Sequence, residues 1–230
     1  MNNLLVYVMF LLCGFEFPQG KDPDLILKKV VDTFSKVKDY VVDVQVKVDV
    51  DFIKVPETKA KIYFKQPDKI NFESDGFAML PKEGINFSPL SFLKNNYTAL
   101  FQKEEYLDNH LVSVIKIIPS SDKGDIVLTT FWIDQSYNII RKIESTTKTN
   151  GTFTIDLKYD EGNKDYWLPS YMIFGFNIDK MNLPKSLSGQ AESESNKNLG
   201  KTAYGKVYIT YSNYRINKGI SDKIFEKKKK

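Results

Sequence analysis

The sequence predicts a mainly β protein of the α+β class: a half-open antiparallel β-barrel, meaning a curved sheet, covered by an N-terminal helix and a short helical lid. From Val42 to Val50, valines alternate with polar residues, which is the period of a strand with one buried face. Several further runs with this period follow, separated by turn-forming residues. Strands with one face exposed to solvent are typical of antiparallel sheets. We expect one domain, residues 21–226.

An export signal is predicted at residues 1–20. Its apolar run Leu4–Phe15 has the length of a signal-peptide core and is too short to span a bilayer. The only cysteine, Cys13, lies within it, and lipid attachment there is the weaker alternative because the preceding Leu12 is not small. If cleavage removes Cys13, the mature chain has no thiol for disulfides, metal sites or nucleophilic catalysis.

A helix should begin at Asp22-Pro23-Asp24. Asp22 can cap the free amides, Pro23 suits the first helical position, and Asp24 complements the helix dipole. The helix should end by Asp39. Its apolar stripe, which has helical spacing, consists of Ile26, Val30, Phe34 and Val37.

The remaining strands are predicted from alternating apolar residues between turn signals. They are Lys61–Lys65, Ile70–Phe72, Tyr97–Lys103, Leu111–Pro119, Ile126–Ile133, Ile139–Ser145, Phe153–Tyr159, Trp167–Asp179 and Lys206–Arg215. Asn150-Gly151 is the strongest hairpin signal. Residues 184–202 are rich in Ser, Asn, Glu and Gly, and we expect a flexible loop there.

Between residues 76 and 96 the apolar residues lose their periodicity. Ser88-Pro89 is typical of a helix start, so a short helix is expected to lie across one opening of the sheet. Either this segment is a lid over a pocket, or it is a crossover packed on the core. The side chains that would form the cover are Phe77, Met79, Leu80, Phe87, Phe92 and Leu93.

Charge and composition exclude some functions. Four lysines at 227–230 carry as much charge as the whole chain's formal net charge of +4, so the body is nearly neutral and no nucleic-acid partner is expected. This basic tail either attracts the protein to anionic membranes or is a solvated, disordered end.

No catalytic constellation is present in the sequence. The single histidine, His110, follows Asp108-Asn109 and is predicted to be a solvent-exposed turn residue. Glu104, Glu105 and Asp108 could in principle act as an acid pair, but their hydrophilic surroundings predict solvated side chains. We therefore expect a protein that is not an enzyme and has no cofactor and no metal.

An apolar cavity is the positive hypothesis. A wide sheet with one apolar face must be covered, and two small covers would leave room for a ligand unless the core is fully packed. An acyl chain would gain about 0.8 kcal/mol per buried CH₂. The side chains predicted to line the cavity are Val42, Val44, Val46, Ile62, Phe64, Ile70, Phe72, Phe131, Phe153, Ile155, Phe174 and Phe176.

The order of these elements resembles the LolA-like periplasmic lipoprotein carriers. The likeness covers nearly the whole mature chain, and each motif is weak when taken alone. The segments that resemble the family are Lys61–Ile70 with its Pro67-Asp68-Lys69-Ile70 element, Trp132-Ile133-Asp134 with Ile139–Ile143, Leu168-Pro169-Ser170, and Tyr214–Phe225.

This resemblance implies a monomeric periplasmic carrier without a cofactor, which holds lipoprotein acyl chains or another lipid for transfer to the outer membrane. Its partners would be an inner-membrane release complex and an outer-membrane acceptor. One feature departs from the family: the best-known carriers hold the lid with an arginine on an early strand. Here the arginines are Arg141 and Arg215, and the early strands offer Lys47, Lys61 and Lys65, which cannot form a planar clamp.

An alternative function from a different class uses the same scaffold. The protein could be an envelope stress sensor or regulatory binding module, with lipid as its signal and a membrane protein as its partner. An enzyme acting on lipid esters is the third hypothesis.

Overall fold

The computed structural model describes residues 20–50, 53–54, 56–73, 93, 96–149, 151–160, 162, 165–177 and 204–226. Apart from Gly20, the predicted export signal lies outside these residues, as do the predicted flexible loop at 184–202 and residues 227–230. The described elements are α1 (Pro23–Ser35), β1 (Asp39–Val50), β2 (Ile53–Lys54), β3 (Thr58–Lys65), β4 (Lys69–Glu73), β5 (Tyr97–Leu107), β6 (His110–Pro119), β7 (Ile126–Asp134), β8 (Ile139–Thr147), β9 (Thr152–Tyr159), β10 (Pro169–Asn177), β11 (Tyr204–Ile216) and the 3-10 helix η2 (Asp222–Phe225).

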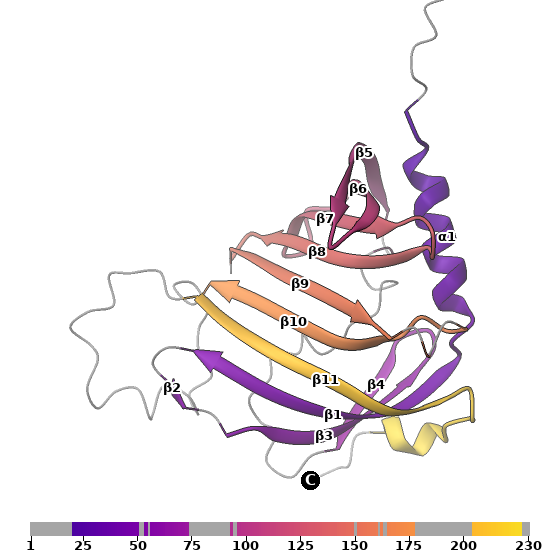
Figure 1. Ribbon diagram of the computed structural model, residues 1–230, viewed down its shortest axis with the longest axis vertical. Helices are drawn as coiled ribbons and strands as arrows, with labels where there is room; N and C mark the ends of the chain where they lie inside the picture. The colour runs from indigo at the N-terminus through magenta and orange to yellow at the C-terminus, as the bar shows by residue number, and fades with distance from the viewer. Residues whose placement is uncertain are drawn as a thin grey trace, which may run out of the picture.

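All the strands belong to one antiparallel sheet. Its order is β4-β3-β1-β11-β10-β9-β8-β7-β6-β5, and β2 pairs with β1 beside β3. The sheet is strongly curved, with β5 and β6 at its upper end and β3 and β4 at its lower end (Figure 1). Among the described residues the edge strands β4 and β5 do not pair with each other, so the sheet is not closed. The prediction of a mainly β, half-open antiparallel sheet with an N-terminal helix is confirmed; the predicted helical lid lies outside the described residues.

The alternation of apolar and polar residues explains why each strand has one buried face. In β1, Val42, Val44 and Val46 are at most 4% exposed, while the polar residues between them point to the other side. In β10 and β11 the apolar residues also meet across the strands, since Met172 pairs with Ile209 and Phe174 with Val207. The buried residues of all these strands form one core cluster on the concave face.

The start of α1 follows the predicted signal. The Asp22 carboxylate accepts hydrogen bonds from the backbone N–H groups of Asp24 and Leu25 at 2.9 and 3.3 Å, and Pro23 is the first helical residue. Ile26, Val30 and Phe34 are buried as predicted, and Leu27 joins them. Val37 is buried just beyond the end of the helix.

Several strand boundaries differ from the predictions, and the differences in β5 and β10 bear on candidate residues. β5 continues to Leu107, so Glu104 and Glu105 lie within a strand rather than in a hydrophilic connection. Trp167 does not begin a strand, because its φ of 45° lies in the left-handed region; β10 begins at Pro169. A hairpin of β8 and β9 is confirmed where the sequence predicts it, and Gly151 in its connection has a positive φ of 73°, which suits glycine; Asn150 lies outside the described residues.

Candidate functional site

The predicted cavity-lining residues lie together on the concave face of the sheet. Neighbouring members face each other across the strands, as Ile62 and Phe72 do between β3 and β4. Those that are buried, at most 7% exposed, are Val42, Val44, Val46, Ile62, Phe64, Phe131, Ile155, Phe174 and Phe176. Those that are half-buried and packed against the same cluster are Ile70, Phe72 and Phe153. The concave face is thus a continuous apolar surface from β4 to β7.

Most of the predicted cover lies outside the described residues. This applies to Phe77, Met79, Leu80, Phe87 and Phe92. The sixth member, Leu93, is half-buried and packs against the core cluster.

Helix α1 covers one end of the concave face. It runs along the right side of the sheet in Figure 1, from the level of β5 down to the level of β1. The Phe34 ring meets the Phe64 ring of β3 edge to face, with 5.7 Å between their centroids. At the other end of the helix, Lys21 Nζ lies 2.5 Å from Glu104 Oε1 of β5. The helix therefore bridges strands that are far apart in the sheet order.

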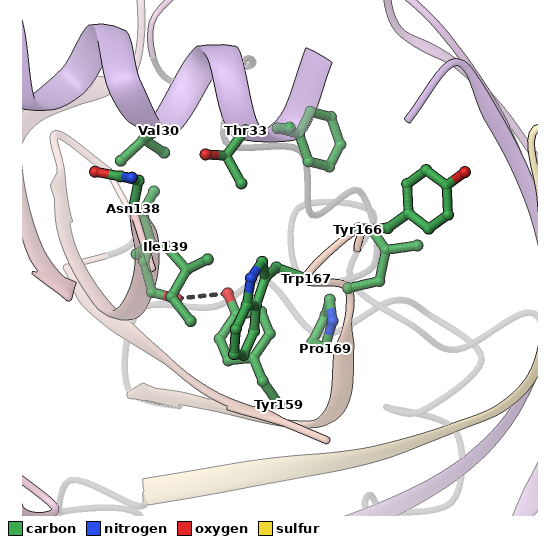
Figure 2. A pocket seen from close by; sticks show the side chains of 11 residues that line it. Val30, Thr33, Asn138, Ile139, Tyr159, Tyr166, Trp167 and Pro169 are labelled. Carbon is green, nitrogen blue, oxygen red and sulfur yellow. Dashed lines mark hydrogen bonds between the residues drawn. The ribbon is translucent and has the colours of Figure 1, made fainter. Parts of the chain in front are cut away.

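A small cavity of about 20 Å³ lies between α1 and the ends of β8, β9 and β10. Figure 2 shows it between Val30 and Thr33 of the helix and Ile139, Tyr159 and Trp167 on the opposite side. Phe34 of the helix also lines it. The Tyr159 hydroxyl donates a hydrogen bond of 2.6 Å to the carbonyl oxygen of Ile140. A cavity of this volume holds about one water molecule. An acyl chain could enter here only if α1 or the surrounding side chains moved.

Aromatic residues with hydroxyl groups interrupt the apolar surface near α1. Tyr40, Tyr211 and Tyr214 belong to the core cluster or pack against it. Burial raises the pKa of each of these phenols, so all of them remain protonated at physiological pH. The sequence analysis missed them as site residues because they continue the apolar alternation of β1 and β11. The sequence marked these tyrosines by a hydroxyl group at positions where the alternation predicts a buried side chain.

The convex face has a wider but polar groove of about 600 Å³. Asp43, Gln45, Lys61 and Glu73 are among the residues that line it. Lys61 Nζ lies 3.9 Å from the Asp43 carboxylate, so the charges are mixed and partly paired. Such a lining does not suit a hydrocarbon ligand.

The prediction that His110 is a solvent-exposed turn residue is wrong. His110 begins β6, its side chain is 38% exposed, and its Nδ1 lies 3.2 Å from the Asp134 carboxylate and 3.0 Å from Arg141 Nη2. Arg141 is also paired with Asp134, which is 1% exposed. Strand pairing brings these three side chains together, and this pairing could not be predicted from the sequence.

The candidate acids Glu104 and Glu105 are held in their ionised form. The Lys21 ammonium lowers the pKa of Glu104, and the hydrogen bond from Lys103 lowers the pKa of Glu105. A general acid needs a raised pKa, so neither carboxylate suits that role. Both carboxylates are 31–34% exposed but also hydrogen-bonded, Glu105 to the Trp132 indole at 2.6 Å, so the prediction of simply solvated side chains was incomplete.

Two further searches concern metals and membranes. Within the described residues, His, Cys, Asp and Glu side chains do not gather in groups of three that could hold a metal ion. In that same part of the chain, neither the length nor the apolar character of any helix is sufficient to cross a bilayer.

Comparison of the structure with solved structures identifies several similar proteins. A DUF1329 family protein from Desulfovibrio piger has a TM-score of 0.56 and 15% sequence identity, over 90% of this chain and 98% of that chain. A Vibrio parahaemolyticus domain described as an outer membrane lipoprotein-sorting protein has a TM-score of 0.56 and 12% identity, over 90% and 98% of the two chains.

A LolA superfamily protein from Nitrosomonas europaea is equally similar. It has a TM-score of 0.56 and 13% identity, over 89% of this chain and 97% of that chain. No protein-family model and no curated protein sequence matches the chain. Sequence identities this low limit the conclusion to a similarity of fold, which extends over almost the whole length of the neighbours.

Proposed function

Since this chain has a LolA-like fold, we propose that it is a periplasmic carrier that holds acyl chains of lipoproteins, or of another lipid, for transfer to the outer membrane. The acyl chains would lie against the concave face of the sheet. Residues 1–20 would direct export, and no cofactor or metal would take part.

The observation that supports this proposal best is the continuous apolar surface of the concave face. The predicted lining residues come from strands far apart in the sequence, yet all lie on this one side. Each methylene group moved from water to this surface would gain about 0.8 kcal/mol. The groove on the convex face has a lining of mixed charge, which does not suit a hydrocarbon.

Ligand entry would require α1 to move. The cavity beneath the helix holds about one water molecule, and the concave side chains are closely packed. The N-terminal end of α1 is joined to β5 by an ion pair whose side chains are 47% and 31% exposed, a weak attachment. Displacing the helix would uncover the apolar residues beneath it.

The direct test is to purify the protein from the periplasm of a Gram-negative host and to examine it by native mass spectrometry and lipid extraction. We expect a bound lipid, and uptake of a fluorescent fatty acid by the delipidated protein. Protein that is consistently empty and takes up no fatty acid would refute the proposal.

A matched pair of variants tests which face binds the ligand. Phe153→Leu changes a half-buried aromatic side chain on the concave face, whereas Tyr171→Leu changes one on the convex face. We expect the first variant to weaken fatty-acid binding and the second to leave it unchanged. Equal effects would exclude the concave face as the binding surface.

Crosslinking in cells separates the carrier from the alternative regulatory function. A carrier should trap lipoproteins, an inner-membrane release complex and an outer-membrane acceptor. A sensor should trap a signalling membrane protein. Trapping of the latter alone would exclude the carrier role.

A further inference from the structure

The buried and half-buried tyrosines of the core differ in how their hydroxyl groups are bonded. Tyr214 donates a hydrogen bond of 2.8 Å to the carbonyl oxygen of Pro169, and Tyr159 donates one of 2.6 Å to that of Ile140. These two hydroxyls are satisfied by the protein itself, as buried polar groups normally are.

Tyr40 and Tyr211 do not follow this rule. Both side chains are 8% exposed. In the part of the chain that the structure describes, the Tyr40 hydroxyl makes no hydrogen bond, and the Tyr211 hydroxyl approaches only the Met172 sulfur, at 3.8 Å. A thioether is a weak acceptor. A buried hydroxyl without a good partner lowers the stability of the folded protein, so its presence needs an explanation.

The two tyrosines lie on either side of Tyr214 on the concave face. Both contact the Tyr214 ring, Tyr40 edge to face at 5.6 Å and Tyr211 in a stacked arrangement at 6.2 Å. Tyr40 also stacks on Phe64 at 5.0 Å, and Phe64 contacts Phe34 of α1. Because Phe34 lines the small cavity, the Tyr40 ring is separated from that cavity by a layer of aromatic side chains. Movement of α1 would remove part of this layer.

The surroundings favour a neutral partner. No lysine, arginine or histidine is among the buried residues of the described chain. Its buried carboxylates, Asp39 and Asp134, already accept hydrogen bonds from the protein. An ionised ligand group would therefore be buried without a counter-charge, which is costly. A carbonyl oxygen accepts hydrogen bonds without bringing a charge.

We propose that Tyr40 and Tyr211 donate hydrogen bonds to the ester carbonyl of an acyl-ester lipid that lies along the concave face. This inference rests on the proposed function and narrows it: the preferred ligand is an acyl ester rather than a plain hydrocarbon or an ionised fatty acid.

The test compares three substitutions in the full-length protein: Tyr40→Phe, Tyr211→Phe and the control Tyr214→Phe, whose hydroxyl already has a partner. The probes are methyl hexadecanoate, hexadecanoate and a saturated hydrocarbon of matching length. Binding is measured by displacement of a neutral polarity-sensitive fluorophore and by native mass spectrometry, and thermal unfolding is followed without ligand.

We expect Tyr40→Phe and Tyr211→Phe to weaken binding of the methyl ester by roughly three- to tenfold each, as the loss of one hydrogen bond predicts. Hydrocarbon binding should not change, and Tyr214→Phe should not alter the preference for the ester. Wild-type protein should bind the ester more tightly than the ionised acid.

Without ligand, Tyr40→Phe and Tyr214→Phe should change the melting temperature differently. Tyr40→Phe should raise the melting temperature or leave it unchanged, since it removes an unpaired buried hydroxyl, whereas Tyr214→Phe should lower it. Equal destabilisation by both would show that Tyr40 is already satisfied, for example by a buried water, and would overturn the inference.

The binding outcomes distinguish the inference from the proposed function. If the wild-type protein binds none of the probes, the proposed function fails, and the inference fails with it. If it binds them but the tyrosine substitutions do not change the ester-to-hydrocarbon ratio, or the ionised acid binds more tightly, the inference alone fails.

Discussion

The two ends of α1 are attached to the sheet by different interactions. At the N-terminal end, the described polar attachment is the partly exposed ion pair between Lys21 and Glu104. At the C-terminal end, the Phe34 ring packs against the fully buried Phe64. The connection that follows, residues 36–39, is also held by hydrogen bonds from two distant segments.

Those segments are the ends of β3 and β11. The Gln66 side chain donates to the carbonyl oxygen of Val37 at 2.7 Å. Asn217 accepts a hydrogen bond from the N–H of Lys38 at 2.7 Å and donates one to the carbonyl oxygen of Lys36 at 2.9 Å. The buried Asp39 carboxylate accepts from two backbone N–H groups just after Asn217.

This difference shows where the helix can separate from the sheet most easily. Exposed ion pairs contribute about 0–1 kcal/mol, whereas a buried aromatic contact together with several exposed or partly buried hydrogen bonds contributes more. Ile26 and Leu27 are also buried near the N-terminal end of α1, but the polar attachment of this end is the weaker of the two, so we expect it to open first, with residues 36–39 as the hinge.

Phe64→Ala should have the largest effect. It removes a fully buried ring that contacts both Phe34 and Tyr40, and we expect the free energy of unfolding to fall by about 3–5 kcal/mol. Urea denaturation measures it. Tyr63→Ala, on the opposite face of the same strand, should cost less; an equal loss would mean that the concave contacts are not what anchors this end.

Asn217→Ala should have an intermediate effect. It removes the hydrogen bonds to residues 36 and 38, worth about 1 kcal/mol each, and places alanine at a φ of 55°, which adds about 1 kcal/mol of strain. Asn217→Gly removes the same bonds without the strain. Thermal and urea unfolding should therefore rank wild type above Asn217→Gly and Asn217→Gly above Asn217→Ala. If Asn217→Gly is as stable as wild type, these bonds do not hold the hinge.

Lys21→Ala should change global stability by less than about 1 kcal/mol. It should nevertheless accelerate hydrogen exchange in the first turns of α1, leave the Phe34 end unchanged, and speed fatty-acid uptake. Lys28→Ala is the matched control, since Lys28 pairs with Asp32 on the exposed side of the helix. The same acceleration in both variants would contradict a specific role for the Lys21 attachment.

Acidification should have the smallest effect. The hydrogen bond from Lys21 lowers the pKa of Glu104 below its ordinary value of 4.5. The stabilisation that the Lys21–Glu104 ion pair gives is therefore complete above pH 4.5, and it is lost as the pH falls through the lower pKa that Glu104 has in the folded protein. NMR shifts of the first α1 amides should report this titration, and Glu104→Gln should abolish it. A titration that persists in the variant must come from another group.

The sequence predicted the elements well because their signals are local. The Asp22-Pro23-Asp24 start of α1 and the alternation in β1 each depend on a few consecutive residues, and both were confirmed. The residues that share the concave face could also be predicted, because side chains two positions apart in a strand point to the same face. Errors occurred where the signal was not local, as for His110, whose partners come from β7 and β8.

The amino-acid order alone thus determined which residues form strands, where α1 begins, and which side chains share the buried face. Only the tertiary structure decided that β1 lies between β3 and β11, that the ends of α1 have unequal attachments, and that the buried Tyr40 and Tyr211 hydroxyls have no good partner among the described residues. The reason is physical: backbone periodicity acts over a few residues, whereas strand order and hydrogen-bond satisfaction depend on which distant segments meet when the chain folds.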